Sequence, residues 1–165
     1  MFHFKVPSSL PFMLLVCVAF PVRAVDATHN AANHAVTLQL APKLQALLAE
    51  EMVAISAASA KILTALVAGD HATVEKQATA IHDSFILNQK LTPEDREALE
   101  KSLPPDFVSM DATFHAQAKR LADVARRRDI DLEHFYFARM IDTCQTCHRR
   151  FATGKFPGFA EAAKN

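Results

Sequence analysis

Apolar residues recur every three or four positions along four long segments of this 165-residue chain, and few segments alternate as a strand does. The chain has only three glycines, whereas alanine, the best helix former, is abundant. This pattern predicts an all-α fold. The links between the long segments are short apart from one, which predicts an up-down-up-down four-helix bundle with a short extra helix in the second-to-third connection.

Capping residues, prolines and glycines set the boundaries of these expected helices. The expected ranges are 38–68 or 42–68, 71–90, 92–103, 106–127 and 129–152. Asp70 should cap the second helix, and Thr92, followed by Pro93 and two acidic residues, should cap the short one. The inward seam of the first helix is expected at spaced positions, namely Leu44, Leu48, Met52, Ile55, Ser59, Ile62 and Leu66.

The amino terminus has the pattern of a secretory signal peptide. A charged start with Lys5 precedes an apolar run from Leu10 to Val22, and Ala24 offers a small residue for cleavage. The run is shorter than the ~20 apolar residues that span a bilayer, and we expect no membrane span in the mature chain. We therefore expect a periplasmic protein made of a signal peptide (1–24), a flexible lead-in (25–37), the bundle (38–153) and a tail (154–165).

Export would remove Cys17, which leaves the two cysteines of Cys144-Gln145-Thr146-Cys147-His148. Cys-x-x-Cys-His is the attachment signature of c-type haem, in which both thiols bond the porphyrin and the histidine binds the iron. Residues three apart lie close together on one helical turn, so both sulfurs can reach one porphyrin. We expect one covalent haem c held by Cys144 and Cys147, with His148 as the proximal ligand.

Other readings of the cysteine pair stay open. A thioredoxin-like pair would require a neighbouring βαβ pattern, which the sequence lacks. A structural zinc site requires four ligands, and no second Cys/His pair is spaced to complete one. A cofactor-free periplasmic helical bundle with a redox-active or metal-binding cysteine pair is the remaining alternative to haem.

A four-helix bundle with Cys-x-x-Cys-His near the end of its last helix resembles the cytochrome c-prime family, the class II c-type cytochromes. The resemblance covers about Leu38 to Phe151 and rests on architecture and motif position. Phe151, three residues after His148, matches an aromatic that is common in the family. Ala152 stands where the family often has arginine, while Arg149 and Arg150 come earlier, so the partner of a haem propionate is not assigned.

The resemblance implies that the residue facing the sixth iron position decides the function. In this family the first helix faces that position, with an apolar residue in the gas-binding subtype and a methionine in the low-spin, electron-transferring subtype. Met52 resembles that methionine, although a gap-filling core methionine would occupy the same seam position. His82 is the alternative distal ligand, whereas Met140 lies on the helix of His148 and cannot easily reach the opposite haem face.

We therefore expect a periplasmic c-type cytochrome that transfers single electrons between unidentified redox partner proteins. The alternatives are a five-coordinate haem protein that binds NO or CO, and the cofactor-free bundle. No acid–base pair is evident, so an enzyme is not expected. The 18 basic and 18 acidic side chains balance, which argues against a nucleic-acid partner. Members of the family often dimerise through their first two helices, which implies a homodimer.

Overall fold

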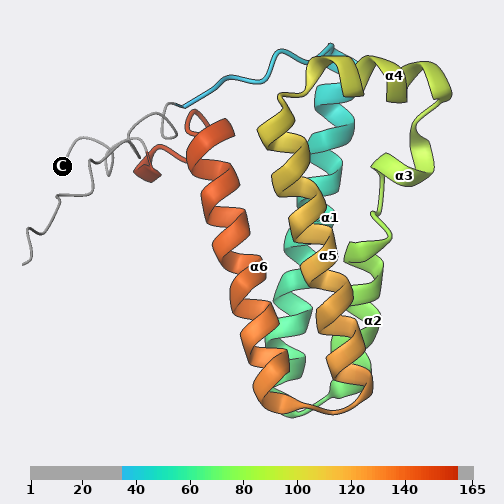
Figure 1. The fold of residues 1–165 in the computed structure, drawn as a ribbon, viewed down its shortest axis with the longest axis vertical. Coiled ribbons are helices and arrows are strands. Elements are labelled where there is room, and N and C mark those ends of the chain that lie inside the picture. The colour runs from blue at the N-terminus through green and yellow to red at the C-terminus, as the bar shows by residue number, and fades with distance from the viewer. Residues whose placement is uncertain (1–34, 160–165) are drawn as a thin grey trace, which may run out of the picture. The chain divides into compact units, whose positions relative to one another are not determined.

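The computed structural model describes residues 35–159, apart from the side chain of Asn88. The expected signal peptide, most of the lead-in and the end of the tail lie outside these residues. Within them all regular elements are helices, and the predicted all-α bundle is confirmed (Figure 1). In chain order they are α1 (Pro42–Ala68), α2 (His71–His82), α3 (Leu87–Lys90), α4 (Pro93–Ser102), α5 (Pro105–Arg126) and α6 (Ile130–Phe151).

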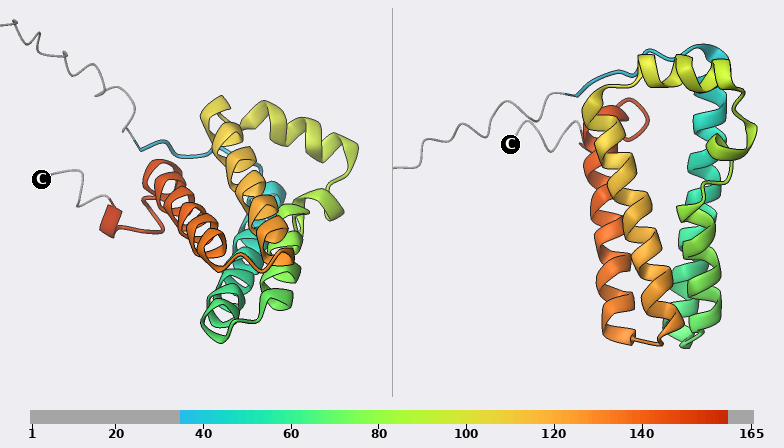
Figure 2. Two further views of the ribbon diagram at one scale, coloured as in Figure 1. Left: turned by 60° about the horizontal axis from the view of Figure 1, so that its bottom comes forward. Right: turned by 45° about the vertical axis from the view of Figure 1, so that its right-hand side comes forward.

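The four longest helices, α1, α2, α5 and α6, lie side by side (Figures 1 and 2). α2 packs closely against α1 and α5, and α5 packs closely against α6, whereas α1 and α6 meet only sparsely. The α1–α2 pair and the α5–α6 pair approach each other at the end where each pair turns, and diverge toward the other end (Figure 2, right). The last turns of α6, which carry the Cys-x-x-Cys-His motif, lie at the diverging end.

The turn between α1 and α2 forms where the sequence predicts it. Gly69 ends α1 in the left-handed conformation, with φ of 67°, which glycine adopts without a steric penalty. Asp70 then caps α2, since its carboxylate accepts a hydrogen bond of 3.0 Å from the backbone N–H of Thr73. The two helices are thereby joined tightly, which explains their close packing.

The end of α2 differs from the sequence prediction. The expected helix continued to Lys90, but α2 ends at His82 and the prediction was wrong on this point. Ser84 has a φ of 61°, which a right-handed helix cannot contain. The chain resumes helical structure at Leu87, as the separate helix α3. The segment from 83 to 86, called the α2–α3 link below, therefore joins α2 to α3 as non-helical backbone.

A buried glutamate on α1 satisfies the backbone of the α2–α3 link. The carboxylate of Glu51 accepts hydrogen bonds from the N–H groups of Phe85 (3.0 Å), Ile86 (2.6 Å) and Leu87 (3.1 Å). These amides have no preceding helical turn to supply carbonyl partners, so the carboxylate takes the role that an N-cap side chain usually has. The helix break thus depends on a residue from another helix.

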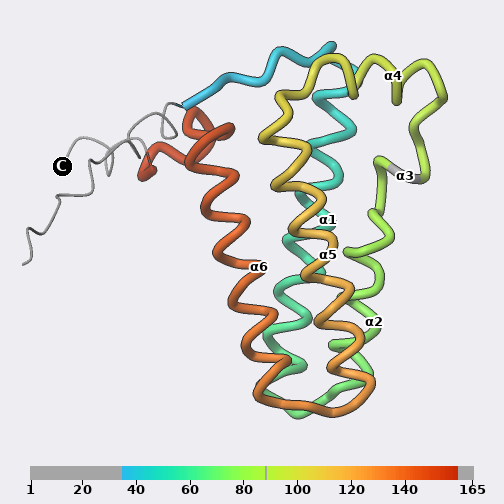
Figure 3. Tube along the Cα trace, viewed as in Figure 1, coloured from blue at the N-terminus to red at the C-terminus, as the bar shows by residue number. Residues whose placement is uncertain are grey.

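The predicted extra helix is present as α4. Thr92 and Asp95 form a capping box in which each side chain accepts a 3.2 Å hydrogen bond from the other residue's backbone. The Lys43 ammonium, at the start of α1, lies 2.5 Å from the Asp95 carboxylate and ties α4 to α1. The path from α2 through α3 and α4 to α5 can be followed in Figure 3.

The buried stripe of α1 is rotated about the helix axis by about 50°, half the angle between successive residues, from the predicted seam. Leu44, Ile55 and Ile62 are buried as expected, but Glu51 is also buried, and Met52 is only half-buried. Ile55 and Ile62 join the hydrophobic core, and Met52 packs against its edge. Met52 therefore lies on a flank of α1 rather than at the centre of its inward face.

By length and hydropathy alone, α1 could also cross a membrane, and it is the one helix in the described part of the chain that could. A core helix of a bundle has the same composition, and Ile55 and Ile62 of α1 indeed pack into the core. The outward face of α1 is apolar as well, with Val53, Leu63 and Val67 exposed by 67%, 55% and 84%.

The residues before α1 contact the end of α6. The backbone N–H of Val36 donates a 2.7 Å hydrogen bond to the carbonyl of Arg150. Carbonyls in the last turn of a helix have no partner within the helix. The extended segment before α1 supplies one such partner and so joins the chain just before α1 to the last turn of α6.

Candidate functional site

The cysteines of the motif occupy consecutive turns near the end of α6 as free, half-buried thiols. Burial raises the pKa of Cys144, and burial together with the nearby Asp111 and Cys144 raises the pKa of Cys147 to about 11. Both thiols are therefore protonated at neutral pH. Because the thiolate is the reactive form in disulfide exchange and the form that binds metal ions, this environment disfavours a redox-active or metal-binding pair.

The His148 ring is half-buried and is covered by a residue that follows α6. Phe156 stacks on the imidazole, with ring centroids 4.3 Å apart and an angle of 13° between the planes. Burial, with a contribution from the positive charge of Lys155, lowers the pKa of His148. A neutral imidazole is the form that coordinates iron, so the environment suits a ligand.

His148 lies on the flank of α6 that faces away from α5. The side toward α5 is marked by Thr143, whose hydroxyl donates a 2.9 Å hydrogen bond to Gln117, and by Arg150, which pairs with Asp106. Successive helical residues are about 100° apart, which places His148 about 140° around α6 from Thr143. His148 therefore faces away from α5, on the side of α6 that Phe156 covers.

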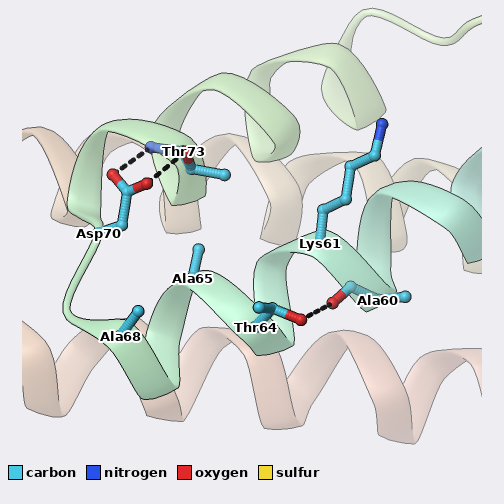
Figure 4. A pocket seen from close by; sticks show the side chains of 7 residues that line it. All are labelled: Ala60, Lys61, Thr64, Ala65, Ala68, Asp70 and Thr73. Carbon is cyan, nitrogen blue, oxygen red and sulfur yellow. Dashed lines mark hydrogen bonds between the residues drawn. The ribbon is translucent and has the colours of Figure 1, made fainter.

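Met52 occupies the corresponding flank of α1. The side toward α2 is marked by a shallow groove of about 380 Å³ whose lining includes Ala65 of α1 and Thr73 of α2 (Figure 4). The same helical geometry places Met52 about 140° around α1 from Ala65, across the buried stripe. α1 has α6 as its other long neighbour. Met52 therefore lies on the flank of α1 that faces away from α2, at the edge of the core.

His82 lies in a different interface. Its Nδ1 is 3.2 Å from the carbonyl oxygen of His115, and the Nδ1 of His115 is 2.7 Å from the carbonyl oxygen of Ile81. This reciprocal pair ties the last turn of α2 to α5. His82 has one ring nitrogen engaged in this contact, whereas within residues 35–159 no hydrogen bond engages the thioether of the half-buried Met52.

The other methionines lie elsewhere. Met140 of α6 is 1% exposed and belongs to the core cluster. Met110 of α5 is half-buried and lines a second groove, of about 180 Å³, between α5 and α6. Arg139 and Thr143 line the same groove, which puts Met110 on the side of α6 that faces away from His148.

The two arginines that follow the motif, Arg149 and Arg150, differ in their contacts and in their exposure to solvent. Arg150 pairs with Asp106 and lies with its guanidinium 5.5 Å from the ring centre of Phe151. Phe151 in turn packs edge-on against Phe107, with 5.3 Å between the ring centres. Arg149 is exposed and lies 5.7 Å from the ring centre of Phe159. Arg149 is thus the arginine of the pair that is open to an anionic group.

Sequence reasoning missed two residues of this region. Glu51 stands at a seam position, and a lone acidic residue within an otherwise apolar stripe is a visible indication of a buried polar contact. Phe156 follows the end of α6, and the chain must turn back for it to stack on His148. Gly154 and Pro157 indicate a turn here but do not indicate its direction. Phe156 contacts the candidate ligand His148, and Glu51 directly precedes Met52 on α1.

Within residues 35–159, no group of three or more His, Cys, Asp and Glu side chains is arranged to hold a metal ion. This finding concerns sites for free metal ions only, because a haem iron takes four of its ligands from the porphyrin. The donors on α6, two thiols one turn apart and an imidazole, fit haem c, and Met52 of α1 offers a thioether for the remaining iron position. Comparisons of the chain with protein-family models, with curated proteins and with solved structures give no match.

Proposed function

We propose that this protein is a periplasmic c-type cytochrome that transfers single electrons. The observation that carries the proposal is the arrangement near the end of α6 of two half-buried thiols one turn apart next to the half-buried His148, while Met52 of α1 is half-buried at the edge of the core. Imidazole and thioether are the axial ligand pair of electron-transferring cytochromes. Resemblance to the cytochrome c-prime family, in its methionine-ligated subtype, agrees with this assignment.

The chain's residues have distinct roles in this proposal. Cys144 and Cys147 would hold haem c on α6 through thioethers, and the imidazole of His148 would bind its iron. The stack of Phe156 on His148 limits rotation of that imidazole. The sulfur of Met52 would be the second protein ligand of the iron. When bound, haem c provides the exchange of one electron between ferric and ferrous iron.

The protein environment favours the ferrous state. A thioether opposite a histidine raises the reduction potential, because it stabilises ferrous iron more than ferric iron. Apolar residues of the core cluster, among them Ile55 and Phe114, limit the water that can reach the interior. Unidentified redox proteins would be the electron donor and acceptor, and no catalytic role is proposed for the chain itself.

A five-coordinate haem protein that binds NO or CO is the second candidate. Met52 is half-buried at the edge of the core, where it could line a distal pocket without reaching the iron. The third reading, a cofactor-free bundle with a redox or metal-binding cysteine pair, is disfavoured by the raised pKa of both thiols.

A homodimer through α1 and α2 belongs to the same proposal. The outward face of α1 exposes Val53, Leu63 and Val67, an apolar surface that a second copy would cover. The periplasmic location rests on the signal-peptide pattern of residues 1–24.

Expression with its own leader in a bacterium that matures c-type cytochromes tests the proposal. A pyridine haemochrome assay on the periplasmic protein should find one covalent haem per chain, and Cys144→Ala together with Cys147→Ala should remove it. Absence of covalent haem from the wild-type protein would refute both haem-based functions. A low-spin ferrous spectrum that carbon monoxide leaves unchanged supports electron transfer, whereas a high-spin, CO-binding ferrous form supports the gas-binding candidate.

A further inference from the structure

Glu51 is the most buried charged residue in the described part of the chain, with an exposed fraction of 1%. Its Oε1 accepts from the backbone N–H of Phe85, and its Oε2 accepts from those of Ile86 and Leu87. Hydrogen bonds to an ionised acceptor are roughly twice as strong as neutral ones. One carboxylate therefore holds α1 firmly against the α2–α3 link.

This contact fixes the position of α1 along its axis and its rotation about that axis, at the turn that carries Glu51. α1 and α6 meet only sparsely, so the α6 side contributes little to holding α1 in place. Side-chain ends lie roughly 5–6 Å from a helix axis, so a rotation of about 20° would move the end of Met52 by about 2 Å. A metal–ligand bond tolerates much smaller displacements. The position of the Met52 sulfur thus depends on whatever holds the turn that carries it.

We propose that Glu51 is a positioning residue for Met52: its contact with the α2–α3 link holds the methionine sulfur at the distance from the iron that ligation requires. The proposal rests on the function proposed above. Loss of the contact would free α1 to shift, and the iron would become five-coordinate and open to carbon monoxide. A residue that touches neither haem nor ligand would then decide between the two haem-based functions.

Glu51→Gln tests this, because glutamine keeps the size of the side chain but replaces one acceptor oxygen with an N–H donor. Two exchanges serve as controls. Glu133→Gln changes another buried carboxylate, 2% exposed, in the first turns of α6. Glu50→Gln changes the exposed neighbour of Glu51, which pairs with Lys90 at 2.8 Å. Glu51→Asp, which keeps the charge but shortens the reach, is the second variant if Glu51→Gln does not fold.

All variants are purified as haem-bearing protein, and the haem content is checked by pyridine haemochrome. In Glu51→Gln, the affinity of the ferrous protein for carbon monoxide should rise at least about tenfold, because one or two hydrogen bonds to a charged acceptor are lost. The reduction potential should fall, and the amides of residues 85–87 should exchange hydrogen about tenfold faster or more. Glu51→Asp should give smaller changes in the same direction, and both controls should keep the wild-type spectrum.

The proposal that Glu51 positions Met52 is overturned if amide exchange at 85–87 accelerates in Glu51→Gln or Glu51→Asp while the spectrum, the reduction potential and the affinity for carbon monoxide stay as in the wild type. It is equally overturned if Glu133→Gln changes these properties as much as Glu51→Gln, because the effect would then follow stability alone. A wild-type protein without covalent haem, or with a high-spin ferrous iron, would instead contradict the proposed ligation by Met52. The two failures are therefore distinguishable.

Discussion

The hydrogen bond between His71 and Glu133 should contribute measurably to the stability of the bundle. It joins the first residue of α2 to the first turns of α6, with 2.6 Å between Nδ1 and Oε1. The two side chains are 21% and 3% exposed, so solvent screens the contact little. A hydrogen bond to a charged group contributes about 1.5–3 kcal/mol, and removing one partner of a buried pair costs about 3–5 kcal/mol.

We expect Glu133→Ala to lower the free energy of unfolding by about 3 kcal/mol, because it also leaves the His71 ring without its partner. With a urea m-value of about 1–3 kcal/mol/M, the unfolding midpoint should fall by about 1–3 M. A double-mutant cycle with His71→Ala should give a coupling free energy of about 2 kcal/mol. Coupling below about 0.5 kcal/mol, the range of independent sites, would refute the reasoning.

Two further predictions concern single side chains. Met52→Ala should convert a low-spin ferrous protein into a high-spin one that binds carbon monoxide, and should lower the reduction potential. The matched control is Met110→Ala, which changes the half-buried methionine of α5 and should leave the spectrum and the potential unchanged. Burial lowers the pKa of His115, but hydrogen bonding and attraction from Asp111, with the Ile81 carbonyl, outweigh it, so the pKa lies above its ordinary 6.5. The resulting stability is full below about pH 6.5 and lost as the pH rises through the raised pKa, so urea midpoints should fall over that interval in the wild type and fall less in Asp111→Asn.

Local signals in the sequence were enough for the helix ends that depend on neighbouring residues. Gly69 with Asp70, and Thr92 with Asp95, act within a single turn, so their chemistry can be recognised from the sequence alone. The end of α2 could not be predicted in this way. Its amide partners come from Glu51, more than thirty positions earlier in the chain, and tertiary contacts override the helical pattern that continues to Lys90.

In the candidate site, too, some features follow from neighbouring residues and others depend on tertiary contacts. Cys144, Cys147 and His148 form a local motif on one helix, and the sequence is sufficient to place them together. The role of Met52 depends on which flank of α1 faces α6. A three- and four-residue spacing fits a stripe centred on Glu51 as well as one centred on Met52, and only the contacts of Glu51 distinguish the two.

The sparse contact between α1 and α6 has a consequence for the order of folding. α1 with α2, α2 with α5, and α5 with α6 pack as close neighbours along the chain, and contacts of short sequence separation form early. The α1–α6 contact and the hydrogen bond from Val36 to Arg150 span nearly the whole described chain, and their loop-closure entropy places them last. We expect the flank of α6 that carries Cys144 and His148 to stay open until that final closure, which leaves time for covalent chemistry on a nearly folded chain.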